Sequence, residues 1–271
     1  MEPGERGGGQ RIGLTDSGKA IHAAAGPPGR RDLSRFAITD RLEVRTLGLV
    51  PYREGIHVQR AVREEVASGA WDGVLLALRH PPVITLGRRT DPREVHRSPE
   101  DLASLGIDLV AVDRGGGATW HYPEQAVVYP VLDLQVLRLS VPVLLQCIGE
   151  VVIDCLARFG VEALWDADRP GAYVAGAKIA SVGLHLHRGI TTHGVAVNLG
   201  RDLRGFGWVD PCKMAGLAVT SVEDRTGLCP DPDEVARDLA IDLARRIRDA
   251  GRLDRRPVPR EDRRALGREP P

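Results

Sequence analysis

The 271-residue sequence has little lysine, few aromatic residues and no long apolar run. Its 37 basic residues balance 37 acidic residues, so the formal net charge is zero. A general nucleic-acid binder needs excess positive charge to displace phosphate counterions, and we therefore expect no nucleic-acid partner. No stretch of 18 apolar residues occurs, which predicts that the chain has no membrane span and no membrane partner.

The N-terminal stretch MEPGERGGGQRIGL lacks the apolar core of a secretory signal, so we expect a cytoplasmic protein. Four cysteines without CxxC spacing are then expected to be free thiols rather than disulfides or a zinc knuckle. Cys147 and Cys155 recur at helical spacing among apolar residues, which predicts core positions. Cys229, in the polar turn GLCPD, is expected to be exposed and inactive.

Lysine is scarce: the chain has three lysines against 34 arginines. Lysine differs from arginine because it can lose its proton when buried and act as a base. Lys19 lies in a polar stretch, but Lys178 lies in GAYVAGAKIASVG, whose small apolar residues favour the neutral amine. We therefore predict Lys178 as a general base or acid. The alternative is that its stem packs while its ammonium group reaches water.

The composition divides the chain into three parts. Residues 1–38 carry eight glycines and three prolines among the first 30 positions, and we predict disorder there. Residues 252–271 form a charged tail that we also predict to be disordered, which leaves 39–251 as one domain, expected to be a monomer. Strand and helix patterns mix in this domain without strict alternation, which predicts an α+β fold with a mixed or antiparallel sheet.

The element pattern inside this domain is readable from periodicity and capping residues. Strands are expected at 41–50, 73–80, 83–88, 107–114 and 126–134, and in several runs between 172 and 222. Helices are expected at 52–68, after Ser98, at 141–159 and from Pro232. The sequence HRGIT predicts a hairpin turn.

The stretch RGGGATWH, residues 114–121, can expose backbone N–H groups to a carboxylate, a phosphate or a thioester carbonyl. It matches neither GxGxxG nor a Walker loop, and a simple glycine-rich bend is an equal alternative. In HLHRGITTHG, His185, His187 and His193 have spacing that permits zinc, although half-buried strand histidines are commoner. His193 alone is a better candidate for polarising a substrate carbonyl.

The stretch VDPCKMAG holds the fourth cysteine. Pro211 restricts the backbone there, so Cys212 can project into a cleft, and a nearby cation such as Lys178 or Lys213 would favour its thiolate. A thiolate nucleophile, a base and a set of N–H donors are the parts of a covalent acyl-transfer site. Because no nucleotide loop is present, we expect an acyl donor that arrives already activated as a thioester.

Taken in order, RGGGATWH, GAKIASVGLHLHRGITTHGVAVNL and VDPC, together with ITLGRR, resemble the lipoyl/octanoyl transferase family, lipoate-protein ligase B, over about residues 42–225. The resemblance implies a fold shared with biotin ligases and lipoate-protein ligase A. It also implies octanoyl transfer, without a cofactor or a metal, from acyl carrier protein to a lysine of the lipoyl domains of 2-oxoacid dehydrogenase or glycine cleavage proteins.

The same resemblance implies site residues. Its catalytic residues correspond to Cys212 and Lys178. Its substrate-binding residues correspond to Arg114, Gly115, Gly116, Gly117, Ala118, Thr119, Trp120, His121, Ser181, Val182, Gly183, His193, Gly194, Val195 and Ala196.

The sequence departs from the family pattern at three glycines, which are replaced by Tyr122, Glu124 and Lys213. If those glycines have positive φ, each replacement adds strain of about 1 kcal/mol or more. Tyr122 is also expected to narrow the acyl pocket. These changes motivate an alternative function, a diverged and non-catalytic module that binds an acyl group or a lipoyl domain.

Overall fold

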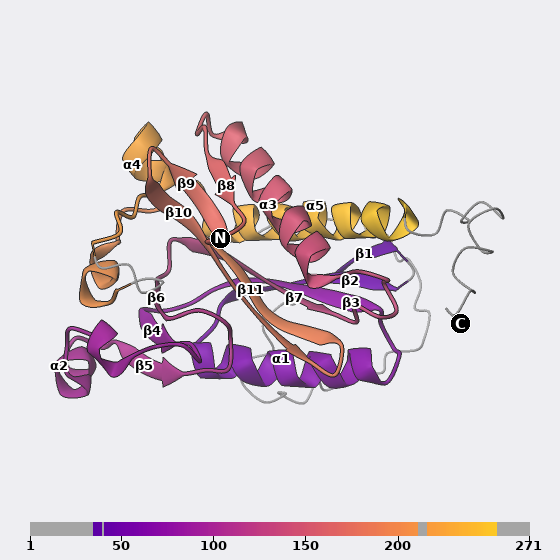
Figure 1. Cartoon of the computed structure of the whole chain (residues 1–271), viewed down its shortest axis with the longest axis horizontal. Coiled ribbons are helices and arrows are strands. Elements are labelled where there is room, and N and C mark those ends of the chain that lie inside the picture. Colours follow the sequence, from indigo (N-terminus) through magenta and orange to yellow (C-terminus); the bar gives the residue numbers. More distant parts are fainter. Residues whose placement is uncertain (1–34, 40, 211–215, 254–271) are drawn as a thin grey trace, which may run out of the picture. The chain divides into compact units, whose positions relative to one another are not determined.

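The computed structural model describes residues 35–39, 41–210 and 216–253 of the chain (Figure 1). Cys212 and Lys213 lie outside the described residues, as does Lys19. Strands and helices alternate irregularly along the chain. The strands are β1 Arg35–Thr39, β2 Leu42–Leu49, β3 Gly73–Arg79, β4 Val83–Leu86, β5 Asp108–Ala111, β6 Ala118–His121, β7 Gln125–Leu132, β8 Leu164–Asp166, β9 Gly171–Val174, β10 Ala177–His187 and β11 Ile190–Asn198. The α-helices are α1 Tyr52–Ala67, α2 Pro99–Ser104, α3 Val141–Arg158, α4 Val222–Thr226 and α5 Pro232–Leu253, with 3-10 turns at Pro92–Glu94 and Arg204–Trp208.

The main sheet has eight strands in the order β1-β2-β3-β7-β11-β10-β9-β8. Only the β2–β3 pair in it is parallel, because α1 connects these two strands and returns the chain to the same edge. A second sheet has the order β5-β4-β6 and combines a parallel and an antiparallel pair. The predicted α+β fold with a mixed sheet is therefore confirmed.

Helices cover both faces of the main sheet, and strand β7 shows why its sequence is apolar throughout. Ala126 and Val128 belong to the core between the sheet and helices α3 and α5. Val127, Tyr129 and Val131 belong to the core between the sheet and α1. In Figure 1, α3 and α5 lie above the sheet and α1 lies below it. A strand buried on both faces reads as a continuous apolar run instead of an alternating one.

The helix starts predicted from capping residues are confirmed. Ser98 and Ser140 accept hydrogen bonds from backbone N–H groups in the first turns of α2 and α3, and Asp231 does the same for α5. The hairpin turn in HRGIT is also confirmed, with Arg188 and Gly189 both at positive φ, as a type I′ turn requires. Cys147 and Cys155 are buried in the core, as predicted.

Other local predictions are wrong. The stretch LAVTSV is not a strand: it forms one isolated bridge, between Val219 and Lys178, and Ser221 then caps α4. Strands β6 and β8 were not expected. Strand β1, Arg35–Thr39, overlaps the last four residues of the segment 1–38, whose predicted disorder stays a prediction for the rest of that segment. No helix among the described residues is long and apolar enough to cross a membrane.

Candidate functional site

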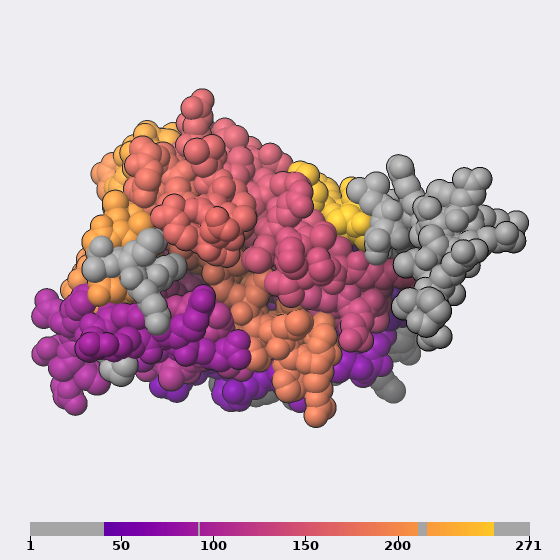
Figure 2. Space-filling view, viewed as in Figure 1, coloured from indigo at the N-terminus to yellow at the C-terminus, as the bar shows by residue number. Residues whose placement is uncertain are grey.

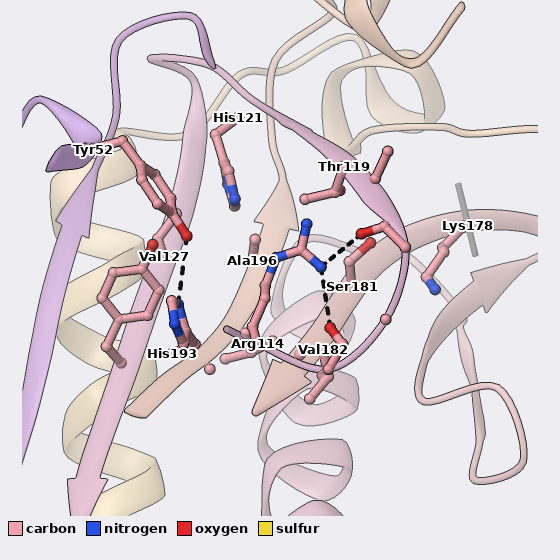
Figure 3. Close-up of a pocket in the computed structure, with 18 residues that line it drawn as sticks. Tyr52, Arg114, Thr119, His121, Val127, Lys178, Ser181, Val182, His193 and Ala196 are labelled. Atoms are coloured by element: carbon pink, nitrogen blue, oxygen red, sulfur yellow. Dashed lines mark hydrogen bonds between the residues drawn. The ribbon is translucent and has the colours of Figure 1, made fainter. Parts of the chain in front are cut away.

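A cavity opens where the loop before β6 faces strands β10 and β11 and the start of α1 (Figure 3). The empty space in and in front of it, with open solvent included, is about 550 Å³. Three stretches that lie far apart in the sequence supply most of its wall. The lining residues are Tyr52, Arg114, Gly115, Gly116, Gly117, Ala118, Thr119, His121, Val127, Tyr129, Lys178, Ser181, Val182, Gly183, His193, Gly194, Val195 and Ala196.

Arg114 holds the glycine-rich loop in shape. Its buried guanidinium donates to the carbonyl oxygens of Gly115 and Gly117, at 3.1 and 2.8 Å. The other side of the same group donates to the carbonyl and hydroxyl oxygens of Thr85, at 2.8 and 2.7 Å. Because one planar fork spans the loop and strand β4, the loop is fixed before any ligand arrives.

Lys178 lies at one end of the cavity, with Tyr52 and His193 at the other end and Arg114 between them (Figure 3). The lysine side chain is 2% exposed, and its Nζ lies 5.5 Å from the centre of the Tyr173 ring. Its backbone N–H donates to the Ala218 carbonyl at 2.8 Å, and its carbonyl accepts from the Thr220 N–H at 3.0 Å. The chain that follows residues 211–215 is therefore tied to the backbone of Lys178.

His193 has an unusual backbone and a fixed ring. It is a non-glycine residue with φ of 57°, and its N–H donates to Gln59 Oε1 at 2.6 Å. Its Nε2 lies 3.1 Å from Asp113 Oδ1, and its Nδ1 lies 3.4 Å from the Tyr52 hydroxyl. Burial lowers the pKa of His193, although the Asp113 carboxylate opposes this, so the neutral ring donates to Asp113 and accepts from Tyr52.

A chain of side-chain hydrogen bonds runs from the cavity to the strand of Lys178. His121 Nδ1 donates to Gln125 Oε1 at 2.6 Å, and Gln125 Nε2 donates to Asn198 Oδ1 at 2.9 Å. Asn198 Nδ2 then donates to the carbonyl oxygen of Thr220 at 3.0 Å. Burial and the neighbouring His80 lower the pKa of His121 well below its ordinary value. Its ring is thus neutral, with Nε2 available as an acceptor.

The described members of the predicted substrate-binding set all line this cavity except Trp120. Successive residues of a strand point to opposite faces, so Trp120 points away from its neighbours Thr119 and His121. Its indole is fully buried against Phe206 and Tyr122, and its Nε1 donates to the Asp202 carbonyl. Its placement therefore gives it a packing position and no contact with the cavity.

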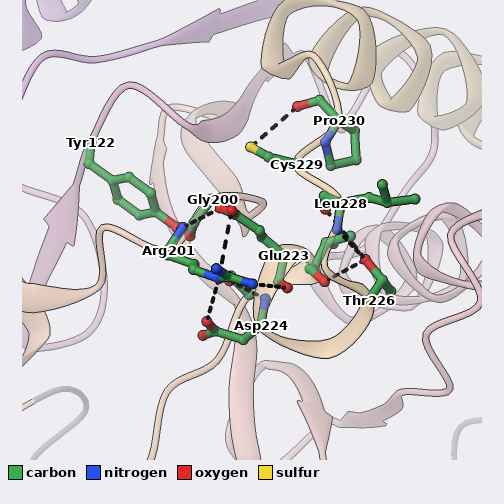
Figure 4. Close-up of polar contacts among 11 residues, drawn as sticks. Tyr122, Gly200, Arg201, Glu223, Asp224, Thr226, Leu228, Cys229 and Pro230 are labelled. Carbon is green, nitrogen blue, oxygen red and sulfur yellow. Dashed lines mark hydrogen bonds and ion pairs between the residues drawn. The ribbon is translucent and has the colours of Figure 1, made fainter.

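Tyr122 does not narrow the cavity, contrary to the sequence-based expectation. Its side chain lies in the core beside Trp120, and its hydroxyl donates to the Gly200 carbonyl at 2.9 Å (Figure 4). Neither Tyr122 nor Glu124 is among the residues with positive φ, so the expected backbone strain is absent at both. The Glu124 carbonyl instead accepts from the N–H groups of Leu199 and Gly200.

The three histidines of HLHRGITTHG, all within the described part of the chain, lie near one another without forming a metal site. The rings of His185 and His187 stack 6.3 Å apart on one side of β10, and His187 is exposed. His185 Nε2 lies 3.5 Å from Asp113, on the same carboxylate that His193 contacts. Within residues 35–39, 41–210 and 216–253, no group of three His, Cys, Asp or Glu side chains is arranged to hold a metal ion.

Cys229 is exposed, as predicted, and its Sγ lies 3.8 Å from the Pro230 carbonyl (Figure 4). It is not among the residues that line the cavity. Burial raises the pKa of Cys155 to about 11, which disfavours a thiolate there. Cys212, the predicted nucleophile, lies outside the described residues.

Sequence reasoning missed Tyr52, Val127 and Tyr129, which line the cavity. Beside them, His80 is fully buried and bridges the Val50 carbonyl and the Tyr129 hydroxyl, at 2.6 and 2.7 Å. Burial lowers the pKa of His80 to about 4 and raises the pKa of Tyr129 well above its ordinary value. The available signal was a tyrosine within the largely apolar β7 and a histidine directly after the largely apolar β3.

Comparisons with known proteins place this chain in a family. Residues 51–243 match the family model of the lipoyl protein ligase A/B catalytic domain. An octanoyltransferase of Syntrophobacter fumaroxidans is 36% identical over 199 residues, which cover 73% of this chain and 87% of that protein. An octanoyltransferase of Pseudomonas entomophila is 39% identical over 206 residues, covering 76% and 92%.

Solved structures share the fold at lower identity. The bi-partite lipoate protein ligase of Thermoplasma acidophilum aligns with a TM-score of 0.55 at 17% identity, over 85% of this chain and 98% of that one. A lipoate-protein ligase A bound with ATP aligns with a TM-score of 0.53 at 17% identity, over 77% and 94%.

Proposed function

The chain belongs to the lipoyl protein ligase A/B catalytic family and is an acyltransferase, and we propose that it moves an octanoyl group from acyl carrier protein to a lysine of a lipoyl domain. In this proposal Cys212 carries the acyl group as a thioester between the two halves of the reaction. The cytoplasmic location and the monomeric state remain predictions from the sequence.

In the first half, Lys178 in its neutral form accepts the proton of the Cys212 thiol. The thiolate attacks the donor's thioester carbonyl, the carbonyl–sulfur bond to the carrier breaks, and the leaving thiolate takes the proton from Lys178. In this proposal, backbone N–H groups of the glycine-rich loop stabilise the negative charge on the carbonyl oxygen.

In the second half, the ε-amine of the acceptor lysine attacks the acyl-enzyme. Lys178 accepts a proton from that amine and returns it to the Cys212 thiolate as the carbon–sulfur bond breaks. An amide and the free enzyme result. A thioester is exchanged for a thioester and then for an amide, so no step requires ATP.

One observation carries the proposal: the substrate-binding residues expected from separate stretches, with the exception of Trp120, line one cavity that Lys178 also lines. Lys178 is held in place at this cavity, because it is 2% exposed and packs beside Gly171, where a Cβ would come within 3.3 Å of its Nζ. The hydrogen bonds between Lys178 and residues 218 and 220 also support the proposal, because they hold a stretch that begins six residues after Cys212 in the sequence against the backbone of Lys178.

Intact-mass measurement after incubation with octanoyl-carrier protein tests the proposal. The wild type should gain one octanoyl group and pass it to an added lipoyl domain. Cys212→Ser and Lys178→Met should lose transfer by at least 100-fold, whereas Cys229→Ser, which removes an exposed thiol, serves as the matched control and should transfer normally. Equal transfer by Cys212→Ser would overturn the covalent mechanism.

The alternative of a non-catalytic module was motivated by Tyr122, Glu124 and Lys213. The first two fit the fold without positive φ and leave the cavity open, so they do not favour it. Binding of octanoyl-carrier protein without turnover would support this alternative.

A further inference from the structure

The turn after β4 is fastened to the glycine-rich loop. The N–H groups of residues 87, 88 and 89 donate to the carbonyl oxygens of Gly117, Arg114 and Gly116, at 3.3, 3.1 and 3.2 Å. A Cβ at Gly87 would come within 2.4 Å of the Gly116 oxygen, so the two segments pack without a gap. The backbone of Arg89 is therefore held in a fixed position relative to the cavity wall.

A second hollow, which we call the vestibule, lies directly outside the cavity and shares with it Gly115, Gly116, Gly117, Val182 and Gly183. Val141, Leu145, Pro170 and Leu184 give it an apolar wall, and its charged residues are Arg89, Asp168 and Arg169. The vestibule contains about 1150 Å³ of empty space, counted to open solvent. Figure 2 shows this face, where the purple and magenta residues of β4 to β6 lie next to the salmon residues of β8 to β10.

The charged residues of the vestibule differ in their partners. Arg169 pairs with Asp166 at 2.6 Å. The exposed guanidinium of Arg89 makes no hydrogen bond or ion pair with any residue in the described part of the chain. Arg88 is likewise exposed but does not line the vestibule. Arg89 is thus a cation at the entrance to the cavity that is available to an anion.

We propose that Arg89 binds the phosphate of a phosphopantetheine-type acyl donor at the vestibule, and this inference rests on the proposed function. Such a donor has its thioester at one end of a flexible arm and its phosphate at the other. With the thioester in the cavity, the amide-containing arm lies along the vestibule, and an arginine matches a phosphate oxygen pair. Because Arg89 is fixed to the glycine-rich loop, binding the phosphate also sets the depth of the thioester.

Kinetics with three octanoyl donors test this assignment. Octanoyl-carrier protein and octanoyl-CoA carry phosphate, whereas octanoyl-pantetheine does not. Arg89→Ala should raise KM about tenfold for the two phosphate-bearing donors, as expected for loss of one charge-assisted contact, and change kcat/KM for octanoyl-pantetheine less than twofold. Arg89→Lys should recover part of the loss. Arg88→Ala, an equal change of charge outside the vestibule, should leave KM within twofold for all three donors.

Several outcomes overturn the inference. A loss seen with carrier protein and not with octanoyl-CoA would assign Arg89 to the carrier's protein surface. An equal rise in KM for Arg88→Ala would show that Arg89 acts only through the general positive charge of this surface. An equal loss of kcat/KM with octanoyl-pantetheine would show that Arg89→Ala impairs the chemical step or the fold and not phosphate binding. If the wild type transfers an octanoyl group from none of the three donors, the proposed function is overturned. The phosphate site can then be tested separately by titrating phosphopantetheine into Cys212→Ser and into Cys212→Ser/Arg89→Ala. Equal affinity of the two variants for phosphopantetheine would show that Arg89 does not bind the phosphate.

Discussion

Replacing Arg114 by lysine keeps the charge and removes the fork that holds the glycine-rich loop. Arg114 donates in two directions, to Gly117 at 2.8 Å and to both oxygens of Thr85 at 2.7 and 2.8 Å. A lysine ends in one nitrogen and cannot span both sides, so about two of these bonds are lost. Each hydrogen bond to a charged group contributes roughly 1.5–3 kcal/mol, which gives a loss of about 3 kcal/mol or more in the free energy of unfolding.

Urea and thermal unfolding measure this loss. A decrease of about 3 kcal/mol corresponds to a fall in Tm of about 6 °C or more for a domain of this size. Octanoyl transfer should fall at least tenfold, because the loop carbonyls and N–H groups no longer hold their positions. Arg53→Lys, at an exposed position on α1, is the matched control and should stay within about 0.5 kcal/mol of wild type. If Arg114→Lys unfolds and transfers like Arg53→Lys, Arg114 does not support the loop.

Three further predictions concern other groups. The pKa of His80 is about 4 in the folded protein and 6.5 in the unfolded chain. Between these two pH values the unfolded chain therefore binds more protons than the folded protein. Folding stability of about 3 kcal/mol that is present above pH 6.5 is consequently lost as the pH falls to 4. Urea titrations should show this slope in wild type and a shallower one in His80→Gln. Gly87→Ala places a Cβ 2.4 Å from the Gly116 oxygen and should cost about 1–3 kcal/mol and most of the transfer activity, whereas Gly207→Ala, with no atom within 4 Å, should change neither. Iodoacetamide with peptide mapping should label Cys229 in the native protein and Cys155 only after unfolding; native labelling of Cys155 would contradict its burial.

Periodicity and capping predicted most elements because they depend on neighbours in sequence. Ser140 and the apolar spacing after it define α3 without reference to the rest of the chain. Ser221 shows the limit: LAVTSV has strand composition, but the serine hydroxyl accepts from the Asp224 N–H at 3.2 Å and begins a helix instead. Pairing order was not predictable, since β3 pairs with the distant β7, and short strands such as β8 carry too few residues for a period.

The candidate site was predictable to the same extent as the fold: groups identified by residue type were expected, and groups identified only by their neighbours in space were not. Lys178 and the glycine-rich loop were expected from residue type and from family resemblance, and the structure places them on one cavity. Tyr52 and Tyr129 were not expected, because a tyrosine in an apolar strand or at a helix start looks like a core residue until its neighbours in space are known. Trp120, adjacent in sequence to cavity residues, points to the opposite side because side chains alternate along β6.

The bridge between Lys178 and Val219 also constrains how the protein is made. During synthesis β2 and β3 can pair early, but β7 receives its neighbour β11 only after α3, β8, β9 and β10 have emerged. Lys178 acquires its hydrogen bonds to residues 218 and 220 later still. Such long-range pairings form slowly, so a nascent chain that stops short of β11 has a partial sheet and an incomplete cavity. Acyl-transfer chemistry is thereby withheld until β11 and the chain as far as Thr220 have left the ribosome.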